Sequence, residues 1–505
     1  MTLFLDIAGL AAAYASGKAS PDAVLDQVFA RIAKTGVAPV WITLVPPERA
    51  HAKMAEQRRR RAAGENLPLF GIPFAVKDNM DVAGLPTTAA CPDFAYTPTR
   101  SATVVERLEA AGAILVGKTN MDQFATGLVG TRSPYGIVSS ALSAEHISGG
   151  SSSGSAVAVA SGLVSFALGT DTAGSGRVPA AFNNIVGLKP SKGVISARGV
   201  LPACRSQDCV SILAGSCGDA LAVLQAAAAY DPEDPFSRPA PAAAFLPRAL
   251  PAGFRFGVPD QPLDFFGDDE TARLYAEAIA RLEELGGVAT AFNFTPFTEA
   301  ARLLYAGPWV AERLAAIEAF AAAKPDAIHP VVRGIILGAA ELSAVEAFKG
   351  GYRLAELTRA ALAEWAKMEL MMLPTAGTIY TIAQVLEDPV GLNTNLGAYT
   401  NFTNLMDLSA VALPAGFRSD GLPFGITLLG RCFEEGRLAG LADRLHRAWP
   451  QATIGATGRP LPPEGRIEPA PAPEKGAVGR QHQALRQSTI RSKRRTGNFY
   501  WTRGN

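Results

Sequence analysis

The chain has 505 residues, 48% of them hydrophobic, which is enough for one large domain or for two or three ordinary ones. Its 47 Lys and Arg residues balance 46 Asp and Glu residues, and this near-neutral charge argues against a nucleic-acid partner. No run of about 18 apolar residues predicts a membrane span, and the first residues lack the basic start of a signal peptide. The five cysteines are odd in number and form no CxxC, which favours buried thiols in a reducing cytosol, so we expect a cytoplasmic protein.

Helices and strands are predicted in alternation along the N-terminal part of the chain. Two helices are expected within residues 5–34, and Ser20 caps the second of them ahead of Pro21. The elements expected next are a charged helix over 48–64, a strand over 69–76, a helix over 103–112 and a strand over 113–116. Residues 117–122 are expected to open another helix, and residues 128–147 to form a long loop.

The second half of the chain repeats this alternation, which predicts an α/β layer sheet. Strands are expected at 254–258, 288–292, 370–374, 408–414 and 423–429. Helices are expected over 271–285, within 297–367 and over 438–449.

Residues 148–190 are the most informative part of the chain. Two loops of small residues, 149–155 and 171–176, flank an apolar segment that predicts a buried helix followed by a short strand. Both loops therefore lie at the ends of elements, where backbone N–H groups lack partners within their own segment. Hydroxyl groups beside unpaired N–H groups are what acyl transfer requires, namely a nucleophile and an oxyanion hole.

Three other interpretations of this stretch are weaker. A flexible linker seldom borders apolar segments. A phosphate-binding loop would carry a GxxxxGK[ST] or a strand followed by GxGxxG, and neither pattern is found. A Ser-His-Asp hydrolase is disfavoured because none of the five histidines lies in these loops and no GxSxG elbow surrounds Ser175.

Three motifs resemble those of the amidase signature family. GIPFAVKD occupies residues 71–78, GGSSSGSA residues 149–156, and GTDTAGSGRVPA with a later GLKP residues 169–190. The resemblance covers about residues 5–450 and implies an α/β/α sandwich whose mixed, largely parallel central sheet is covered by helices. It also implies a Ser–cis-Ser–Lys triad, with Ser175 as nucleophile, Ser151 as bridging serine and Lys77 as base.

This triad places conditions on its surroundings. Lys77 accepts a proton only when it is neutral, so burial must lower its pKa. Asp171 and Arg177 are expected to hold the nucleophile loop. The oxyanion-hole candidates are the backbone N–H groups of Thr172, Ala173, Gly174 and Ser175.

Simpler roles compete with the catalytic ones. Lys77 could form a salt bridge with Asp78, and Ser151 could be an ordinary turn serine. The neighbours Ser152 and Ser153 make the choice of Ser151 depend on the family pattern. Lys118 is another lysine beside these motifs, and we expect it to be exposed or to cap a helix.

Within the family, the motifs near residues 74–96, 131–136 and 201–212 are similar to those of allophanate hydrolases. These enzymes hydrolyse the amide of urea-1-carboxylate to ammonia and an unstable product that decarboxylates. The resemblance implies that Tyr305 and Arg313, eight residues apart on one helix and roughly 12 Å apart along its axis, hold the substrate carboxylate. It also implies a backbone contact from Gly127. Helix packing is the alternative for Tyr305 and Arg313.

The same resemblance implies a homodimer, a functional link to a urea carboxylase, and no cofactor or metal. Three other functions stay open. GKTNMDQFATG at residues 117–127 also resembles the A subunit of glutamyl-tRNA amidotransferase. A general amidase is the second alternative, and an inactive scaffold protein is the third.

Residues 456–505 differ from the amidase signature domain expected over residues 1–455. They are rich in Pro and Gly and then basic, which predicts a disordered tail; an arm that binds nucleic acid is less favoured. Many allophanate hydrolases carry a further C-terminal domain that helps to dispose of the carbamate product, and this tail does not resemble it. Enzyme-assisted decarboxylation and an assembly role are therefore in doubt, and spontaneous decarboxylation would replace the former.

Overall fold

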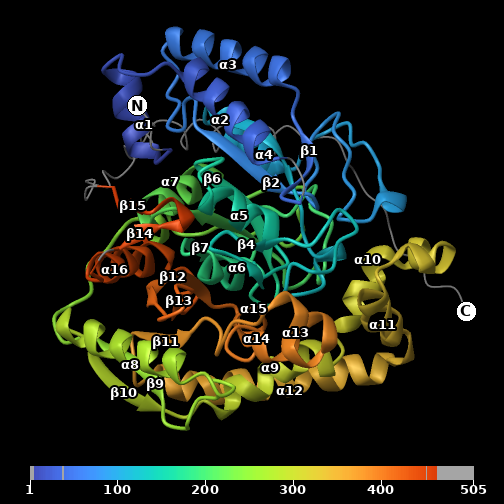
Figure 1. The fold of residues 1–505 in the computed structure, drawn as a ribbon. Helices are drawn as coiled ribbons and strands as arrows, with labels where there is room; N and C mark the ends of the chain where they lie inside the picture. The colour runs from blue at the N-terminus through green and yellow to red at the C-terminus, as the bar shows by residue number, and fades with distance from the viewer. Residues whose placement is uncertain (1–4, 37–38, 451, 463–505) are drawn as a thin grey trace, which may run out of the picture. The chain divides into compact units, whose positions relative to one another are not determined.

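The computed structural model describes residues 5–36, 39–450 and 452–462. An eleven-stranded sheet runs through the middle of this part of the chain (Figure 1). Its strands are, in spatial order, β1 (Trp41–Leu44), β3 (Ile114–Thr119), β2 (Pro73–Lys77), β6 (Phe166–Asp171), β8 (Cys209–Ala214), β7 (Val186–Lys189), β12 (Ser409–Phe417), β13 (Pro423–Gly430), β11 (Leu370–Pro374), β9 (Arg255–Pro259) and β10 (Val288–Phe292).

The sheet is mixed, as predicted. Parallel pairs form two groups, β3-β2-β6 and β11-β9-β10. The strands between these groups pair antiparallel, and so does β1 with β3. Because β2 and β6 are parallel neighbours, their carboxyl ends meet at one edge of the sheet. Lys77 is the last residue of β2, and the loop of residues 172–176 follows β6.

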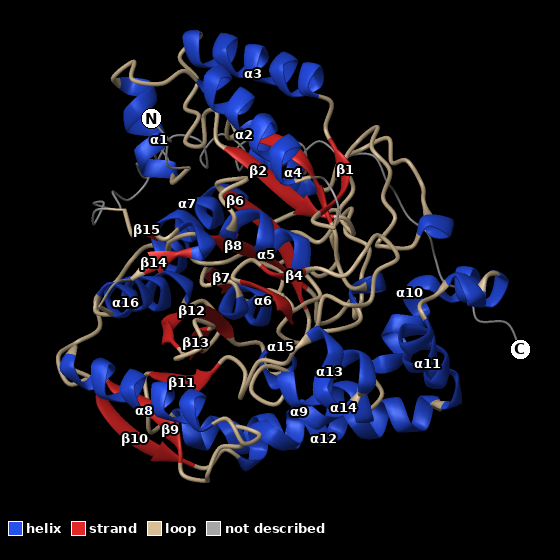
Figure 2. Ribbon diagram, in the orientation of Figure 1, coloured by secondary structure: helices blue, strands red, loops and turns tan. Residues whose placement is uncertain are grey.

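Helices cover the sheet (Figure 2). Every residue of β2, β6, β7, β8 and β11 is buried, which requires a cover on both faces. The longer helices are α1 (Ile7–Ala15), α2 (Pro21–Thr35), α3 (Pro47–Ala62), α4 (Thr103–Ala110), α5 (Ser153–Ala160), α7 (Cys217–Ala227), α8 (Asp269–Glu284), α9 (Thr295–Ala306), α10 (Val310–Ala323), α11 (Pro330–Gly338), α12 (Ala344–Trp365) and α16 (Glu435–Arg447). The short ones are α6 (Arg177–Phe182), α13 (Ile382–Glu387), α14 (Gly391–Leu396) and α15 (Phe402–Leu405).

Several predicted boundaries are corrected by the structure. Residues 117–119 continue β3 and do not open a helix, because their polar side chains find buried partners. The strand expected from residue 69 begins at Pro73, after a turn at residues 68–71. The expected loop over 128–147 contains a short hairpin of β4 (Ser139–Ser140) and β5 (Ser143–Ile147). The first serine-rich loop ends early, because α5 begins at Ser153.

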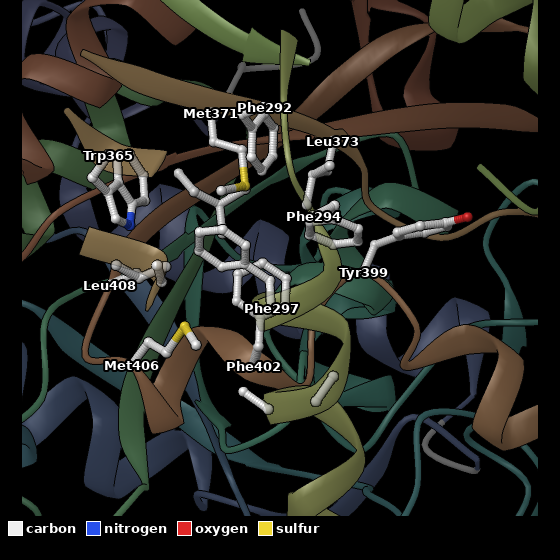
Figure 3. Packing of buried hydrophobic residues seen from close by; sticks show 14 of the residues in the cluster. Phe292, Phe294, Phe297, Trp365, Met371, Leu373, Tyr399, Phe402, Met406 and Leu408 are labelled. Carbon is white, nitrogen blue, oxygen red and sulfur yellow. The ribbon is translucent and has the colours of Figure 1, made fainter. Parts of the chain in front are cut away.

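Aromatic residues build the core beside β11 and β10 (Figure 3). Phe297 of α9 lies 5.4 Å from Phe402 of α15 and 5.6 Å from Phe292 of β10, as ring-centroid distances in edge-to-face geometry. Trp365 at the end of α12 contacts the same ring of Phe297. This cluster fixes α9, α12 and α15 against the sheet, and α9 carries Tyr305.

A second apolar cluster seats α10 and α11. Ile317 and Ala321 of α10 and Val332 and Ile336 of α11 pack against loop residues that include Phe124. Ring contacts join Phe124, Phe94 and Phe320 of α10. The helix that carries Arg313 is thereby anchored beside residues 124–127, which lead into the site.

The described chain ends in a small hairpin of β14 (Thr453–Ile454) and β15 (Arg459–Pro460). The sequence assigns residues 456–462 to the tail, but part of this segment belongs to the hairpin. The remainder of the predicted tail, 463–505, lies outside the described residues. The five cysteines are free thiols, four of them buried. Among the described helices, none has both the length and the apolar character to cross a membrane.

Candidate active site

Lys77 lies at the carboxyl end of β2 and is completely buried. Its Nζ donates to Ser151 Oγ and to Thr170 Oγ1, each at 2.7 Å. Burial disfavours the charged ammonium and lowers the pKa of Lys77 to about 7, although the carboxylates of Asp122 and Asp208 act in the opposite direction. A lysine in this state is a proton acceptor near neutral pH.

Ser151 begins the turn that leads into α5, and the peptide bond between Gly150 and Ser151 is cis. The Ser151 carbonyl accepts the N–H of Asp122 at 3.1 Å. A methyl group on Gly150 would collide with the Asp122 carboxylate, so the loop fits only around glycine there. The Asp122 carboxylate accepts three backbone N–H groups, from Val129, Gly130 and Arg132, and so ties two loops together.

The neighbouring serines have other partners. Ser152 Oγ donates to the Thr170 carbonyl at 3.1 Å, and Ser153 Oγ donates to the Asn120 carbonyl at 3.4 Å. Of the three consecutive serines, Ser151 is therefore the one whose hydroxyl meets Lys77. The geometry supplies the choice that the sequence left to the family pattern.

Ser175 follows β6 in a loop that Asp171 and Arg177 hold. The Arg177 guanidinium donates to both oxygens of the Asp171 carboxylate at 2.9 Å. Ser175 is 3% exposed, and its Oγ donates to the Gly127 carbonyl at 3.5 Å. Its own carbonyl accepts the Ser152 N–H at 3.3 Å. The two serine-bearing loops and the Gly127 segment thus meet around one point.

One oxyanion-hole candidate has a hydrogen-bond partner within its own loop. The N–H of Gly174 donates to Asp171 Oδ1 at 2.9 Å, so it is already used in holding the loop. Within the described residues, the N–H groups of Thr172 and Ala173 donate to no side chain. Together with the N–H of Ser175, they remain the prediction for the oxyanion hole.

Tyr305 and Arg313 do not share one helix, contrary to the sequence-based expectation. Tyr305 lies on α9 and Arg313 on α10, and the chain turns between them at Gly307 and Pro308, because proline cannot continue a helix at that point. The turn brings the two side chains into direct contact. Arg313 Nη2 donates to the Tyr305 hydroxyl at 3.0 Å, and the guanidinium carbon lies 5.0 Å from the centre of the tyrosine ring.

Arg313 is 2% exposed and contacts the segment that precedes Gly127. Its Nη1 donates to Thr126 Oγ1 at 3.0 Å and to the Ala125 carbonyl at 3.3 Å. Thr126 is followed by Gly127, whose carbonyl accepts the hydrogen bond of the Ser175 hydroxyl. Tyr305 also lines a cavity of about 1010 Å³, together with Arg132 and Asn393.

Lys118 is completely buried and neither exposed nor at a helix cap, which overturns the expectation for it. Its Nζ lies 3.1 Å from Asp78 Oδ1 and donates to Thr87 Oγ1 and the Pro86 carbonyl. Asp78 is therefore the partner of Lys118 and not of Lys77. This ion pair leaves Lys77 with hydroxyl partners only.

Known proteins share these motifs and this fold. Residues 23–439 match the amidase family. The chain belongs to the amidase family. It is 47% identical over 414 residues to urea amidolyase of Saccharomyces cerevisiae, covering 81% of this chain and 22% of that protein. It is 35% identical to the A subunit of glutamyl-tRNA(Gln) amidotransferase of Symbiobacterium thermophilum, covering 87% of this chain and 95% of that one.

Solved structures agree with this membership. An allophanate hydrolase of Kluyveromyces lactis superposes with a TM-score of 0.85 at 42% identity, over 88% of this chain and 74% of that one. The urea amidolyase of the same organism superposes with a TM-score of 0.86 over 90% of this chain and 28% of that one. This chain of the amidase family thus spans about a quarter of the length of the urea amidolyases it matches.

Sequence reasoning missed three residues that act on Lys77 in the structure. Thr170 supplies the second hydroxyl contact of Lys77, and Asp122 and Asp208 supply nearby carboxylates. Thr170 gave a usable signal, since it is a polar residue near the end of an otherwise apolar strand that leads into a motif loop. The roles of Asp122 and Asp208 depend on tertiary contacts and gave no comparable signal.

Proposed function

We propose that this chain hydrolyses allophanate, that is urea-1-carboxylate, by amide cleavage at Ser175. The observation that carries the proposal is the position of Arg313, whose buried guanidinium contacts Tyr305 and Thr126. Thr126 directly precedes Gly127, and the Gly127 carbonyl accepts the hydrogen bond of the Ser175 hydroxyl. A guanidinium matches a planar carboxylate in a two-pronged geometry. A small amide that carries a carboxylate close to its scissile bond fits this arrangement.

The proposed chemistry uses the contacts described above. Ser175 Oγ attacks the amide carbon and its proton passes through Ser151 to neutral Lys77, whose Nζ is 2.7 Å from Ser151 Oγ. The N–H groups of Thr172, Ala173 and Ser175 stabilise the oxyanion. The leaving nitrogen takes the proton back and departs as ammonia, and water then hydrolyses the acyl-enzyme. Decarboxylation of the released product yields carbon dioxide without a further group from the site.

Relatives support this choice of substrate, since the K. lactis structure at 42% identity is an allophanate hydrolase. The urea amidolyases that match the chain are much longer, so a urea carboxylase that supplies allophanate is proposed as a functional partner in this case too. A homodimer in the cytoplasm belongs to the same proposal. Glutamine hydrolysis is the alternative that the amidotransferase relatives favour, because they match the chain over nearly their whole length.

Ammonia release from three substrates tests the proposal. The purified chain is given allophanate, glutamine or a neutral aliphatic amide, with Ser175→Ala as the control for contaminating activity. We expect allophanate to give the highest kcat/KM by far. A chain that releases ammonia from glutamine but not from allophanate would support the amidotransferase alternative, and turnover of the neutral amide alone would indicate a general amidase.

A further inference from the structure

Asp208 contacts the nucleophile loop from outside the site. Its Oδ1 accepts the Thr172 hydroxyl at 2.5 Å. The same carboxylate accepts the N–H of Ala203 at 2.7 Å and the N–H of Cys204 at 3.1 Å. Thr172 is therefore tied to the loop of residues 203–208 through one carboxylate, and it is also the first oxyanion-hole candidate after β6.

The loop of residues 203–208 is tied in turn to α10. Glu312 accepts the N–H of Ser206 at 2.8 Å and its hydroxyl at 2.5 Å, and Cys204 Sγ donates to the Trp309 carbonyl at 3.2 Å. Glu312 precedes Arg313 directly in the chain. One short loop is thus hydrogen-bonded both to the loop that carries Ser175 and to the helix that carries the proposed carboxylate-binding arginine.

Asp208 does not belong to the proposed substrate site. It lines a separate cavity of about 630 Å³, together with Arg205, Glu233 and Glu312, and neither Lys77 nor Ser175 lines that cavity. No ion pair in the described part of the chain neutralises its charge, whereas Asp171 is paired with Arg177. Its carboxylate is thus free to act on the loop through Thr172 and, over a longer distance, on Lys77.

We infer that Asp208 is a positioning residue of the hydrolysis, which fixes Thr172 and thereby the N–H groups that stabilise the oxyanion. The inference rests on the proposed amide hydrolysis, but it holds for any amide that Ser175 attacks. An oxyanion forms only during the reaction, so a misplaced oxyanion hole lowers kcat and leaves KM nearly unchanged. We expect about a tenfold to hundredfold fall in kcat, less than the roughly hundredfold to thousandfold cost of losing a donor outright.

Charge provides a readout that a purely structural role would not move. The carboxylates of Asp122, Asp171 and Asp208 raise the pKa of Lys77, while burial and the Arg313 guanidinium lower it. Asp208→Asn removes one of the three negative charges and nearly preserves the shape of the side chain. The acidic limb of the rate profile, which reports the protonation of Lys77, should therefore move to lower pH in this variant.

The experiment compares Asp208→Asn, Thr172→Val, Thr172→Ser and the Asn–Val double variant, with Glu233→Gln as the control. Glu233 lines the same cavity but pairs with surface arginines. We expect Asp208→Asn and Thr172→Val to lower kcat alike, and the double variant to be no slower than the slower single variant. Thr172→Ser keeps the hydroxyl and should recover most of the kcat that Thr172→Val loses. The acidic limb should move in the two variants that carry Asp208→Asn and in no other, and Glu233→Gln should match the wild type.

Several outcomes would overturn the inference. The first is an Asp208→Asn variant with the kcat and the acidic limb of the wild type. The second is a double variant whose loss in kcat equals the product of the two single losses. The third is a change in KM with kcat unchanged in either single variant. If Asp208→Asn fails to fold by circular dichroism, the comparison of Thr172→Val with Thr172→Ser still decides whether the hydroxyl contact matters. Wild-type protein that does not hydrolyse allophanate would count against the proposed function, and the variants would then be measured on the amide that it does hydrolyse.

Discussion

Lys77 shows how one residue acquires unusual chemistry from its place in the chain. It ends a strand whose five residues are all buried, and its Nζ donates to two hydroxyl groups, those of Ser151 and Thr170. Hydroxyl groups both accept and donate hydrogen bonds, so they suit a neutral amine. They carry no negative charge, which a buried ammonium needs as its partner. The neighbouring carboxylate of Asp78 is occupied by Lys118.

The pH dependence of the rate tests this state of Lys77. Protonation removes the base, so kcat/KM should fall as pH falls through about 7, with a slope of one proton. At higher pH the lysine is neutral and the rate should reach a plateau. Rates measured from about pH 5 to 9 with wild type and Lys77→Ala provide the comparison. The variant should be slower by orders of magnitude and should lack this limb; a limb that persists in it would assign the base to another group.

Substitution of Ser175 separates chemistry from stability. Ser175→Ala should abolish ammonia release, because no other hydroxyl replaces the proposed nucleophile. The free energy of unfolding should change by less than about 1 kcal/mol, since the variant gives up one long hydrogen bond, from the serine hydroxyl to the Gly127 carbonyl. Denaturant titration and activity assays measure the two quantities. Ser165→Ala is the matched control, because the hydroxyl of this buried serine has no hydrogen-bond partner among the described residues. Turnover by Ser175→Ala near that of this control would contradict the assignment.

For single residues of the site, the family motifs predicted more than periodicity and composition could. Lys77 contacts Ser151, and the Ser175 carbonyl accepts the N–H of Ser152. The structure distinguishes Ser151 from Ser152 and Ser153 by the partners of their hydroxyl groups. Nothing in DTAGSG indicates which N–H groups the Asp171 carboxylate accepts, and the structure shows that Gly174 provides one of them. Lys118 was misjudged because its partner Asp78 is forty residues earlier in the chain, and an ion pair over that separation leaves no periodic pattern in the sequence.

At the scale of elements, the turn between α9 and α10 decides how the proposed carboxylate site is built. Apolar spacing alone predicts helix throughout this region, and Pro308 is the local signal that argues against one continuous helix. The break places Tyr305 and Arg313 on different helices and in contact at 3.0 Å. Uninterrupted strands were easier to predict, and β10 and β11 have the predicted bounds because short apolar runs between turn residues define them.

Substitutions of this pair test whether it recognises the carboxylate. Losing a buried charged contact typically costs about 2–5 kcal/mol, which corresponds to roughly thirty- to several-thousand-fold in kcat/KM. Arg313→Ala should therefore cripple hydrolysis of allophanate and spare slow turnover of a neutral aliphatic amide. Tyr305→Phe, which keeps the ring and loses the hydroxyl, should show the same selectivity with a loss of about tenfold.

Both substrates are measured on both variants, with thermal melting as the control for folding. An equal loss on the two substrates would mean that Arg313 supports the loop at Ala125 and Thr126 without recognising the carboxylate. Selectivity in Arg313→Ala with none in Tyr305→Phe would limit recognition to the guanidinium.

At the scale of the whole molecule, the end of the described chain closes back onto earlier elements. Gly455 donates its N–H to the Asn184 carbonyl at 2.8 Å, and Asn184 Nδ2 donates to the Thr453 carbonyl at 2.9 Å. Arg447 Nη1 donates to the Pro462 carbonyl at 2.7 Å. A side chain on Gly455 would collide with the backbone of Ala160, which shows how closely the hairpin lies on α5. Composition alone placed the domain boundary at residue 455, within this hairpin, because Pro and Gly there resemble the start of a tail.

Two truncations test where the folded unit ends. A chain that stops after Pro462 should keep the melting temperature and activity of the full chain, since residues 463–505 are poor in the apolar residues that build a core. A chain that stops after Ala452 loses the hairpin with its hydrogen bonds and the partly buried Ile454, which we expect to cost about 2–4 kcal/mol. Its melting temperature should fall by several degrees, and activity should persist below the transition because the hairpin contacts none of the proposed catalytic residues. If the chain ending at Pro462 melted as early as the shorter one, residues 463–505 would have to contribute contacts of their own to the folded protein.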